Sequence, residues 1–172
     1  MAKLGELQKM AVVVITGSTI NQGEALRQLA QLREEGFCFD VLMSYNAGRL
    51  LDKGAIEKAL GPGQILESTG EVSPELFAQP YPTIIVPAMT AYSVAHIANI
   101  TPESPAARAI TGSVMTGKNV VVAVDGCCPH PPLRAEKGYR LTAGLQGTLR
   151  EHLALVGSDG ATVAPASHLA GM

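Results

Sequence analysis

Residues 84–126 read IIVPAMTAYSVAHIANITPESPAARAITGSVMTGKNVVVAVDG, a stretch that predicts a buried strand turning directly into a helix. The first backbone N–H groups of a helix have no partner within the helix, and they carry the positive end of its dipole. Such a turn can bind an anion, and hydroxyl groups like those of Thr90 and Ser93 suit a phosphate. The stretch indicates a nucleotide or flavin binder without indicating a reaction.

Apolar runs alternate with helical patterns along most of the chain. AVVVI at residues 11–15 predicts a strand buried on both faces, and leucines at helical spacing follow it from about Gln22 until Gly36. Further strands are expected at residues 37–43, 64–67, 83–86, 119–124 and 161–164, and further helices at residues 74–78, 90–99, 105–116 and 141–156. Since such alternation is typical of parallel sheets, we predict a three-layer α/β fold, Rossmann-like (flavodoxin-like), with helices on both faces of the sheet.

The remaining segments carry weaker patterns. Residues 47–60 are expected to form a helix or a helix pair broken near Gly54, and residues 68–82 are expected to form a loop or lid around the turn of helix at residues 74–78. We expect residues 1–172 to form a single domain, because a chain of this length buries roughly 70% of its unfolded surface without disulfides. Within it we expect an N-terminal extension at residues 1–10, an irregular loop at residues 126–140 and a tail at residues 165–172.

Composition restricts the partners of the protein. Hydrophobic residues make up 47% of the chain and charged residues only 16%, so we expect sister subunits to cover apolar surface in a homo-oligomer. The formal net charge is −2 and no segment is strongly basic, which argues against a nucleic-acid partner. The apolar runs are far shorter than the ~20 residues that span a bilayer, so no membrane association is expected. An odd number of cysteines and no signal-peptide pattern predict a cytoplasmic protein with reduced thiols.

Three segments are expected to meet at the carboxyl edge of the sheet, where open parallel sheets bind their ligands. They are Gly17-Ser18-Thr19, Ser44-Tyr45-Asn46 and residues 87–93. Each offers small residues, hydroxyl groups or free N–H groups, which suit a phosphate, and none offers a metal-binding cluster. The chain lacks both G-x-G-x-x-G and G-x-x-x-x-G-K-[ST], so a dinucleotide site and a P-loop are disfavoured and a mononucleotide remains.

The motifs at these positions resemble the homo-oligomeric flavin-containing cysteine decarboxylase superfamily. Residues 15–18 (ITGS) are similar to the Gly-Ser turn after its first strand, and residues 87–99 (PAMTAYSVAHIAN) are similar to its Pro-Ala-(Ser/Thr)-Ala-Asn-Thr turn and the helix that follows. Residues 43–47 (MSYNA), 100–101 (IT) and 117–121 (GKNVV) look most like the branch that contains a dipicolinate synthase subunit. The likeness covers about residues 12–124.

This resemblance implies a Rossmann-like sheet that binds FMN, often between the subunits of a trimer or larger assembly. By this resemblance, the residues expected to bind the cofactor are Gly17, Ser18, Thr19, Ser44, Ala88, Met89, Thr90, Tyr92 and Ser93. The Gly-Ser turn and Ser44 would contact the phosphate, and Thr90 and Ser93 would contact the phosphate or the ribityl chain. Ala88 and Met89 would contact the flavin ring.

The chain also departs from the family pattern. Tyr92 replaces the usual Asn, residues 62–82 lack the histidine of the decarboxylases, and residues 124–130 replace their Pro-Ala-Met-Asn substrate motif. These departures favour an electron-transfer or accessory flavoprotein that serves a partner redox enzyme. Two alternatives stay open. One is a flavin-dependent oxidoreductase or decarboxylase-like lyase that acts on a small metabolite, and the other is a phosphate-binding module without flavin, in which Tyr92 fills the ring pocket.

The segment after the last long apolar run contains the candidates for catalysis. These are Asp125, Cys127 and His130. A carboxylate here could act as a general base, and a thiolate beside an imidazolium has a lowered pKa, although turn capping and packing are commoner roles for such residues. Further on, Arg134, Lys137 and Arg140 either grip an anionic substrate or form a solvated positive face.

Overall fold

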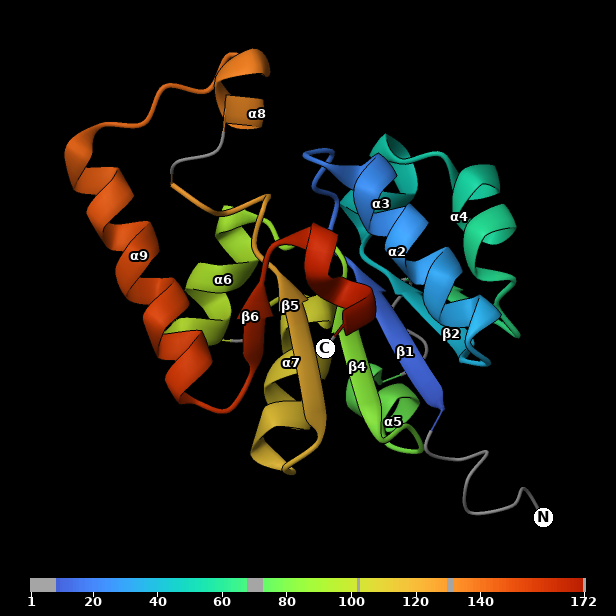
Figure 1. Cartoon of the computed structure of the whole chain (residues 1–172). Coiled ribbons are helices and arrows are strands. Elements are labelled where there is room, and N and C mark those ends of the chain that lie inside the picture. Colours follow the sequence, from blue (N-terminus) through green and yellow to red (C-terminus); the bar gives the residue numbers. More distant parts are fainter. Residues whose placement is uncertain (1–8, 68–72, 102, 130–131, 172) are drawn as a thin grey trace.

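Figure 1 shows the computed structural model of the chain, which describes residues 9–67, 73–101, 103–129 and 132–171. Six strands of this described part form one sheet, and every neighbouring pair is parallel. They are β1 (Met10–Ile15), β2 (Cys38–Met43), β3 (Ile65–Glu67), β4 (Thr83–Val86), β5 (Asn119–Ala123) and β6 (Thr162–Ala164). Their order across the sheet is β3-β2-β1-β4-β5-β6.

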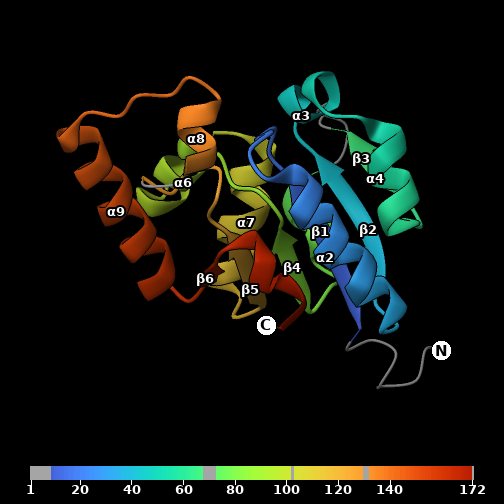
Figure 2. The ribbon, with the colours of Figure 1, turned by 45° about the horizontal axis from the view of Figure 1, so that its top comes forward.

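Helices cover both faces of the sheet (Figures 1 and 2). One face packs against α2 (Gln22–Glu34), α3 (Tyr45–Leu50), α4 (Lys53–Leu60) and the 3₁₀ helix η1 (Ala166–Gly171). The other face packs against α5 (Pro74–Ala78), α6 (Ala91–Ala98), α7 (Pro105–Met115) and α9 (Ala143–Ser158). The predicted three-layer α/β fold with a parallel sheet is confirmed.

The central strand β1 shows why its apolar run is continuous. Val12 and Val14 pack into the core on one face of the sheet, while Ala11, Val13 and Ile15 pack into the core on the other. All five side chains are buried. A strand covered on both faces has no polar side, so its sequence cannot alternate as that of a half-exposed strand does.

The strand order creates a crevice at the carboxyl edge of the sheet. The chain runs outward from β1 through β2 to β3, and β4 then pairs with β1 from the opposite side. The connections after β1 and β4 therefore leave the sheet in opposite directions, and ligands bind at such switch points in doubly wound folds.

The helix pair at residues 47–60 breaks at a different place from the one that we predicted. Leu51 is extended, and the Asp52 side chain accepts a hydrogen bond from the Ala55 N–H at 3.2 Å, which makes Asp52 the N-cap of α4. Gly54 lies inside the first turn of α4 and does not interrupt it. The carboxylate cap, rather than the glycine, decides the boundary.

Two segments expected to lack regular structure contain helices. Within residues 126–140 the chain forms α8 (Pro132–Glu136), which lies near the carboxyl edge of the sheet. The tail at residues 165–172 forms η1, where Ala166 and Leu169 are buried and the Ala170 N–H donates to Gln28 Oε1 on α2 at 2.9 Å. These contacts join positions far apart in the sequence, which local patterns do not reveal. Residues 1–8 of the expected N-terminal extension lie outside the described residues. The last residue of that extension, Met10, is the first residue of β1.

Candidate ligand cavity at the switch point

A cavity of about 620 Å³ lies beyond the carboxyl edge of the sheet. The segments after β1, β2, β4 and β5 all contribute to its wall, so it occupies the crevice that the strand order predicts. Its volume falls within the ~300–1,000 Å³ typical of small-molecule sites. Among the described lining residues no side chain is acidic, and the described residues contain no cluster of potential metal ligands.

The loop after β1 is fixed to the loop after β4. The Thr16 hydroxyl donates to the Ala88 carbonyl oxygen at 2.7 Å and accepts from the Thr90 N–H at 3.2 Å. Gly17 has φ +87°, a conformation that favours glycine, and a Cβ at this position would lie 3.2 Å from the Ala47 backbone nitrogen. The Gly-Ser turn therefore brings its backbone close to the start of α3.

Three helices begin at the cavity wall, and each has a hydroxyl N-cap. Ser44 accepts from the Ala47 N–H at 3.2 Å, Thr90 from the Ser93 N–H at 3.1 Å and Ser104 from the Ala107 N–H at 3.1 Å. All three caps line the cavity, as does Ser93, whose hydroxyl accepts from the Thr90 hydroxyl at 2.9 Å. Helix starts of this kind favour a negative charge nearby, and the remaining hydroxyl hydrogens can be donated to a phosphate.

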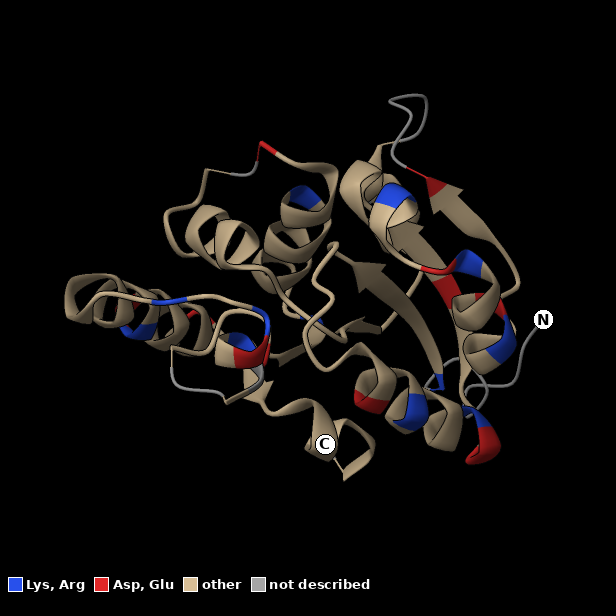
Figure 3. Cartoon of the chain, turned by 90° about the horizontal axis from the view of Figure 1, so that it is seen from above, with Lys and Arg blue, Asp and Glu red and all other residues tan. Residues whose placement is uncertain are grey.

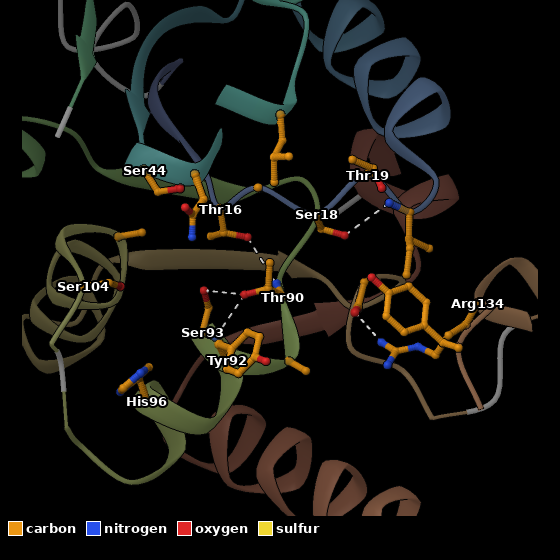
Figure 4. Close-up of a pocket in the computed structure, with 18 residues that line it drawn as sticks. Thr16, Ser18, Thr19, Ser44, Thr90, Tyr92, Ser93, His96, Ser104 and Arg134 are labelled. Atoms are coloured by element: carbon orange, nitrogen blue, oxygen red, sulfur yellow. Dashed lines mark hydrogen bonds between the residues drawn. The ribbon is translucent and has the colours of Figure 1, made fainter. Parts of the chain in front are cut away.

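The wall away from these helix starts contains a buried arginine. Figure 4 shows Ser44, Ser104 and His96 on one side of the cavity and Arg134 on the other, with Thr90 between them. Arg134 Nη2 donates to the Gly126 carbonyl oxygen, and the guanidinium carbon lies 5.8 Å from the centre of the Tyr139 ring. The cavity is therefore polar at both ends, with hydroxyl groups and helix starts at one and a cation at the other.

The structure brings most of the predicted cofactor residues together. The lining includes Gly17, Ser18, Thr19, Ser44, Thr90, Tyr92 and Ser93. Ala88 and Met89, predicted to contact the flavin ring, are not among the lining residues. Met89 packs in the hydrophobic core, and its N–H donates to the Ala123 carbonyl oxygen at 3.0 Å.

Tyr92 does not fill the cavity. The side chain is 83% exposed and stands at the rim, while the cavity behind it is open. The idea of a flavin-free module depended on Tyr92 occupying the ring pocket, and this position gives it no support.

Of the catalytic candidates after β5, the structure describes Asp125 and Cys127. The Asp125 carboxylate accepts from Asn21 Nδ2 at 2.9 Å and from the Ala166 N–H at 2.6 Å, so it joins α2 and η1 to the end of the sheet. His130 is outside the described ranges. Cys127 is completely buried, and burial raises the pKa of its thiol to about 12. Burial of this kind favours a packing role for the thiol over a nucleophilic one.

We expect the Cys127 thiol to resist alkylation in the folded protein. At about pH 8 a thiol with a pKa of about 12 is thiolate in roughly one molecule in ten thousand. Iodoacetamide should therefore modify the exposed Cys38 and leave Cys127 intact, and both should react after unfolding in urea. Mass spectrometry of the digested protein provides the measurement. Equal labelling of the two thiols in the folded state would contradict the assignment.

Sequence reasoning missed part of the cavity wall. Ser104 precedes Pro105, and a serine followed by proline is a common helix start, so this N-cap could have been recognised. His96 also lines the cavity, and its Nδ1 lies 2.8 Å from the Thr101 carbonyl oxygen, which fixes the ring. Arg134 could not be separated from Lys137 and Arg140 by its sequence, yet it is buried while the other two are exposed.

Charges elsewhere on the molecule are interspersed. Figure 3 shows Lys and Arg mixed with Asp and Glu over the helices, without a broad basic surface among the described residues of the kind that follows a nucleic-acid backbone. No helix in the described ranges is long and apolar enough to cross a bilayer.

Solved structures share this fold. DmrB from Burkholderia xenovorans, in its apo form and described as a cubic protein cage for redox transfer, is 14% identical, with a TM-score of 0.70 over 92% of this chain and 88% of DmrB. A dodecameric FMN-dependent UbiX-like decarboxylase from Escherichia coli O157:H7 is 13% identical, with a TM-score of 0.66 over 91% of this chain and 80% of its own. A dipicolinate synthase subunit from Bacillus halodurans C is 23% identical, with a TM-score of 0.55 over 66% of this chain and 62% of its own.

These structures include an FMN-dependent decarboxylase and a dipicolinate synthase subunit, so the fold that the resemblance implied is confirmed. At these identities what they share with this chain is the fold. A scan against protein-family models gives no match, and no curated protein matches the sequence.

Proposed function

We propose that this protein binds FMN in the switch-point cavity and acts in electron transfer or as an accessory flavoprotein. The observation that carries the proposal is the convergence of three hydroxyl-capped helix starts, at Ser44, Thr90 and Ser104, on the wall of one cavity of about 620 Å³. A mononucleotide has one phosphate for these helix starts and a ring system for the remaining space. The FMN dependence of a structure with the same fold supports this choice of ligand.

The donor groups fit the phosphate of FMN. Ser44, Ser93 and Ser104 would hold it, together with the Gly17-Ser18 turn that approaches the start of α3. Thr90 would contact the phosphate or the ribityl chain. The flavin ring would extend toward Gly126 and Tyr139, past Tyr92 at the rim. Bound FMN would supply the electron transfer, and the protein would supply position and polarity.

The chemistry of the lining favours electron transfer over acid–base catalysis. Among the described lining residues there is no carboxylate, and the nearby Cys127 thiol is held neutral by burial. One observation favours the second candidate, a flavin-dependent enzyme acting on a small metabolite: His96 and Arg134 also line the cavity. These two side chains offer a proton-transfer group and an anion-binding group.

We also propose a homo-oligomer, a trimer or a larger assembly, and a partner redox enzyme for the carrier role. Tyr45, Leu50, Tyr92 and Tyr139 are exposed, and the last three line the cavity. A second subunit that covered these side chains would also close the cavity, as sister subunits commonly do with exposed apolar patches. The dodecamer and the cubic cage formed by proteins of this fold support the assembly.

Titration with FMN tests the proposed function. The purified protein should quench the fluorescence of added FMN and bind it at least about tenfold more tightly than riboflavin, because only FMN brings a phosphate to the helix starts. Light scattering on the same sample reports the oligomer. Absence of flavin absorption together with absence of quenching would refute FMN binding. Turnover of a metabolite by the isolated protein under anaerobic conditions would refute the carrier role. The flavin-dependent enzyme would then be the remaining candidate.

A further inference from the structure

Arg134 is a buried cation that has no counter-ion among the described residues. Its side chain is only 6% exposed, and its Nε has no hydrogen-bond partner in the part of the chain that the structure describes. Nη2 donates to the Gly126 carbonyl oxygen, and no ion pair joins the guanidinium to an acidic side chain of the described residues. Buried charges in proteins are normally paired, because removing a charge from water is costly. The described residues therefore provide no anion to pair with this arginine.

The position of Arg134 indicates where that anion would lie. The residue lines the cavity, and Figure 4 shows its guanidinium group directed toward the cavity interior. Tyr139 packs against it with the guanidinium carbon 5.8 Å from the ring centre, and the bond to Gly126 fixes one nitrogen. The donors that remain are those of a planar group held in one orientation, which suits the two oxygens of a carboxylate.

We propose that Arg134 binds the carboxylate of a second ligand, a small organic acid that occupies the cavity beside FMN. The FMN phosphate is assigned to the opposite end, because Ser44 and Ser104 lie across the cavity from Arg134 in Figure 4. Lys137 and Arg140 remain solvated and take no part. The inference rests on the proposed function only in placing FMN at the other end, since the unpaired guanidinium exists without it.

Thermal unfolding with and without carboxylates provides the test. The probes are sodium acetate and sodium malonate, each compared with sodium chloride at matched ionic strength. The apo protein should gain at least about 2 °C in its unfolding midpoint with a carboxylate, because a ligand that binds only the folded state stabilises it. Arg134→Gln should remove this gain. Arg140→Gln is the matched control from the same segment, and it should retain the gain because Arg140 is exposed.

Two outcomes would overturn the proposal. If Arg134→Gln unfolds at a lower temperature but keeps the full carboxylate gain, Arg134 only clamps the loop through Gly126. If Arg134→Gln lowers the affinity for FMN and leaves that for riboflavin unchanged, Arg134 holds the FMN phosphate instead. Should Arg134→Gln fail to fold, Arg134→Lys takes its place, since it keeps the charge and loses the planar fork and should lose most of the gain.

Failure of this inference can be distinguished from failure of the proposed function. If carboxylates raise the unfolding midpoint through Arg134 but the protein binds no flavin, the anion site is supported and FMN binding is refuted. If the protein binds FMN but carboxylates raise the unfolding midpoint of neither the apo nor the FMN-loaded protein, the flavin site is supported and the second ligand is refuted.

Discussion

Replacing Gly126 with alanine is expected to lower the free energy of unfolding by about 3 kcal/mol and to abolish FMN binding, since overpacking of a tight site costs typically 1–3 kcal/mol and sometimes more. A methyl group at this position would overlap the Met89 carbonyl oxygen and the Ser18 hydroxyl, and it would lie 2.9 Å from Ser18 Cβ. The segments after β1, β4 and β5 are therefore in tight contact at Gly126. Any shift that relieves the overlap also changes the shape of the cavity.

The surrounding groups have little freedom to yield to this methyl group. The Met89 N–H donates to the Ala123 carbonyl oxygen at 3.0 Å and the Met89 side chain is completely buried, so its backbone cannot move without disturbing the core. The Ser18 hydroxyl accepts from the Ile20 N–H at 3.3 Å and would lose this bond if it rotated. The loop after β5 must therefore move outward, taking with it the carbonyl group that Arg134 contacts.

Urea unfolding and FMN titration measure the two effects of Gly126→Ala. The matched control is Gly144→Ala in α9, where a Cβ would meet nothing within 4 Å. Alanine in an open helical position should be neutral or stabilise by about 0.5–1 kcal/mol. If both variants were equally stable and bound FMN equally well, the close approach at Gly126 would be irrelevant to the site.

The strands were predictable because burial leaves a local signal. A strand covered on both faces must be apolar throughout, and the runs at residues 11–15, 83–86 and 119–124 meet this condition almost to their observed ends. The helix starts at Ser44 and Thr90 were equally local, since a hydroxyl N-cap bonds only three residues ahead. Once the strands are ordered as a doubly wound sheet, these local features converge on one edge.

The far wall of the cavity was not predictable, because its contacts are long-range. Whether an arginine is solvated or buried depends on what covers it, and nothing in the neighbourhood of Arg134 distinguishes it from Arg140. Asp125 is similar: a carboxylate after a strand suggests catalysis or capping, and only the folded chain brings Asn21 and Ala166 to it. The Met89 side chain is similar, since core packing and not the motif sets its direction, and it does not line the cavity.

Replacing Ser93 with leucine is expected to weaken FMN binding at least about 100-fold, or roughly 2.7 kcal/mol. Ser93 lies in the first turn of α6, is buried and lines the cavity. Leucine would remove the hydroxyl and place three additional carbon atoms where we position the phosphate. Burying a phosphate oxygen against an apolar side chain without a hydrogen bond is strongly unfavourable.

Two further variants separate blocked space from a lost hydroxyl. Ser93→Ala removes the hydroxyl and leaves the space open, so it should weaken FMN binding by about tenfold or less, in keeping with the loss of one hydrogen bond. Ser158→Leu makes the same change at an exposed position at the end of α9 and should leave FMN affinity unaltered. Unfolding midpoints of all three variants establish that each is folded when it is titrated.

Riboflavin then identifies which part of the ligand Ser93 faces. If the phosphate lies at the start of α6, Ser93→Leu should reduce the affinity for FMN far more than that for riboflavin, because only FMN carries the group that is displaced. Equal losses for both ligands would place the ribityl chain or the ring beside Ser93 and move the phosphate toward Ser44 and the Gly17 turn. Unchanged affinity for both would remove α6 from the site, and the convergence of helix starts would then no longer account for flavin binding.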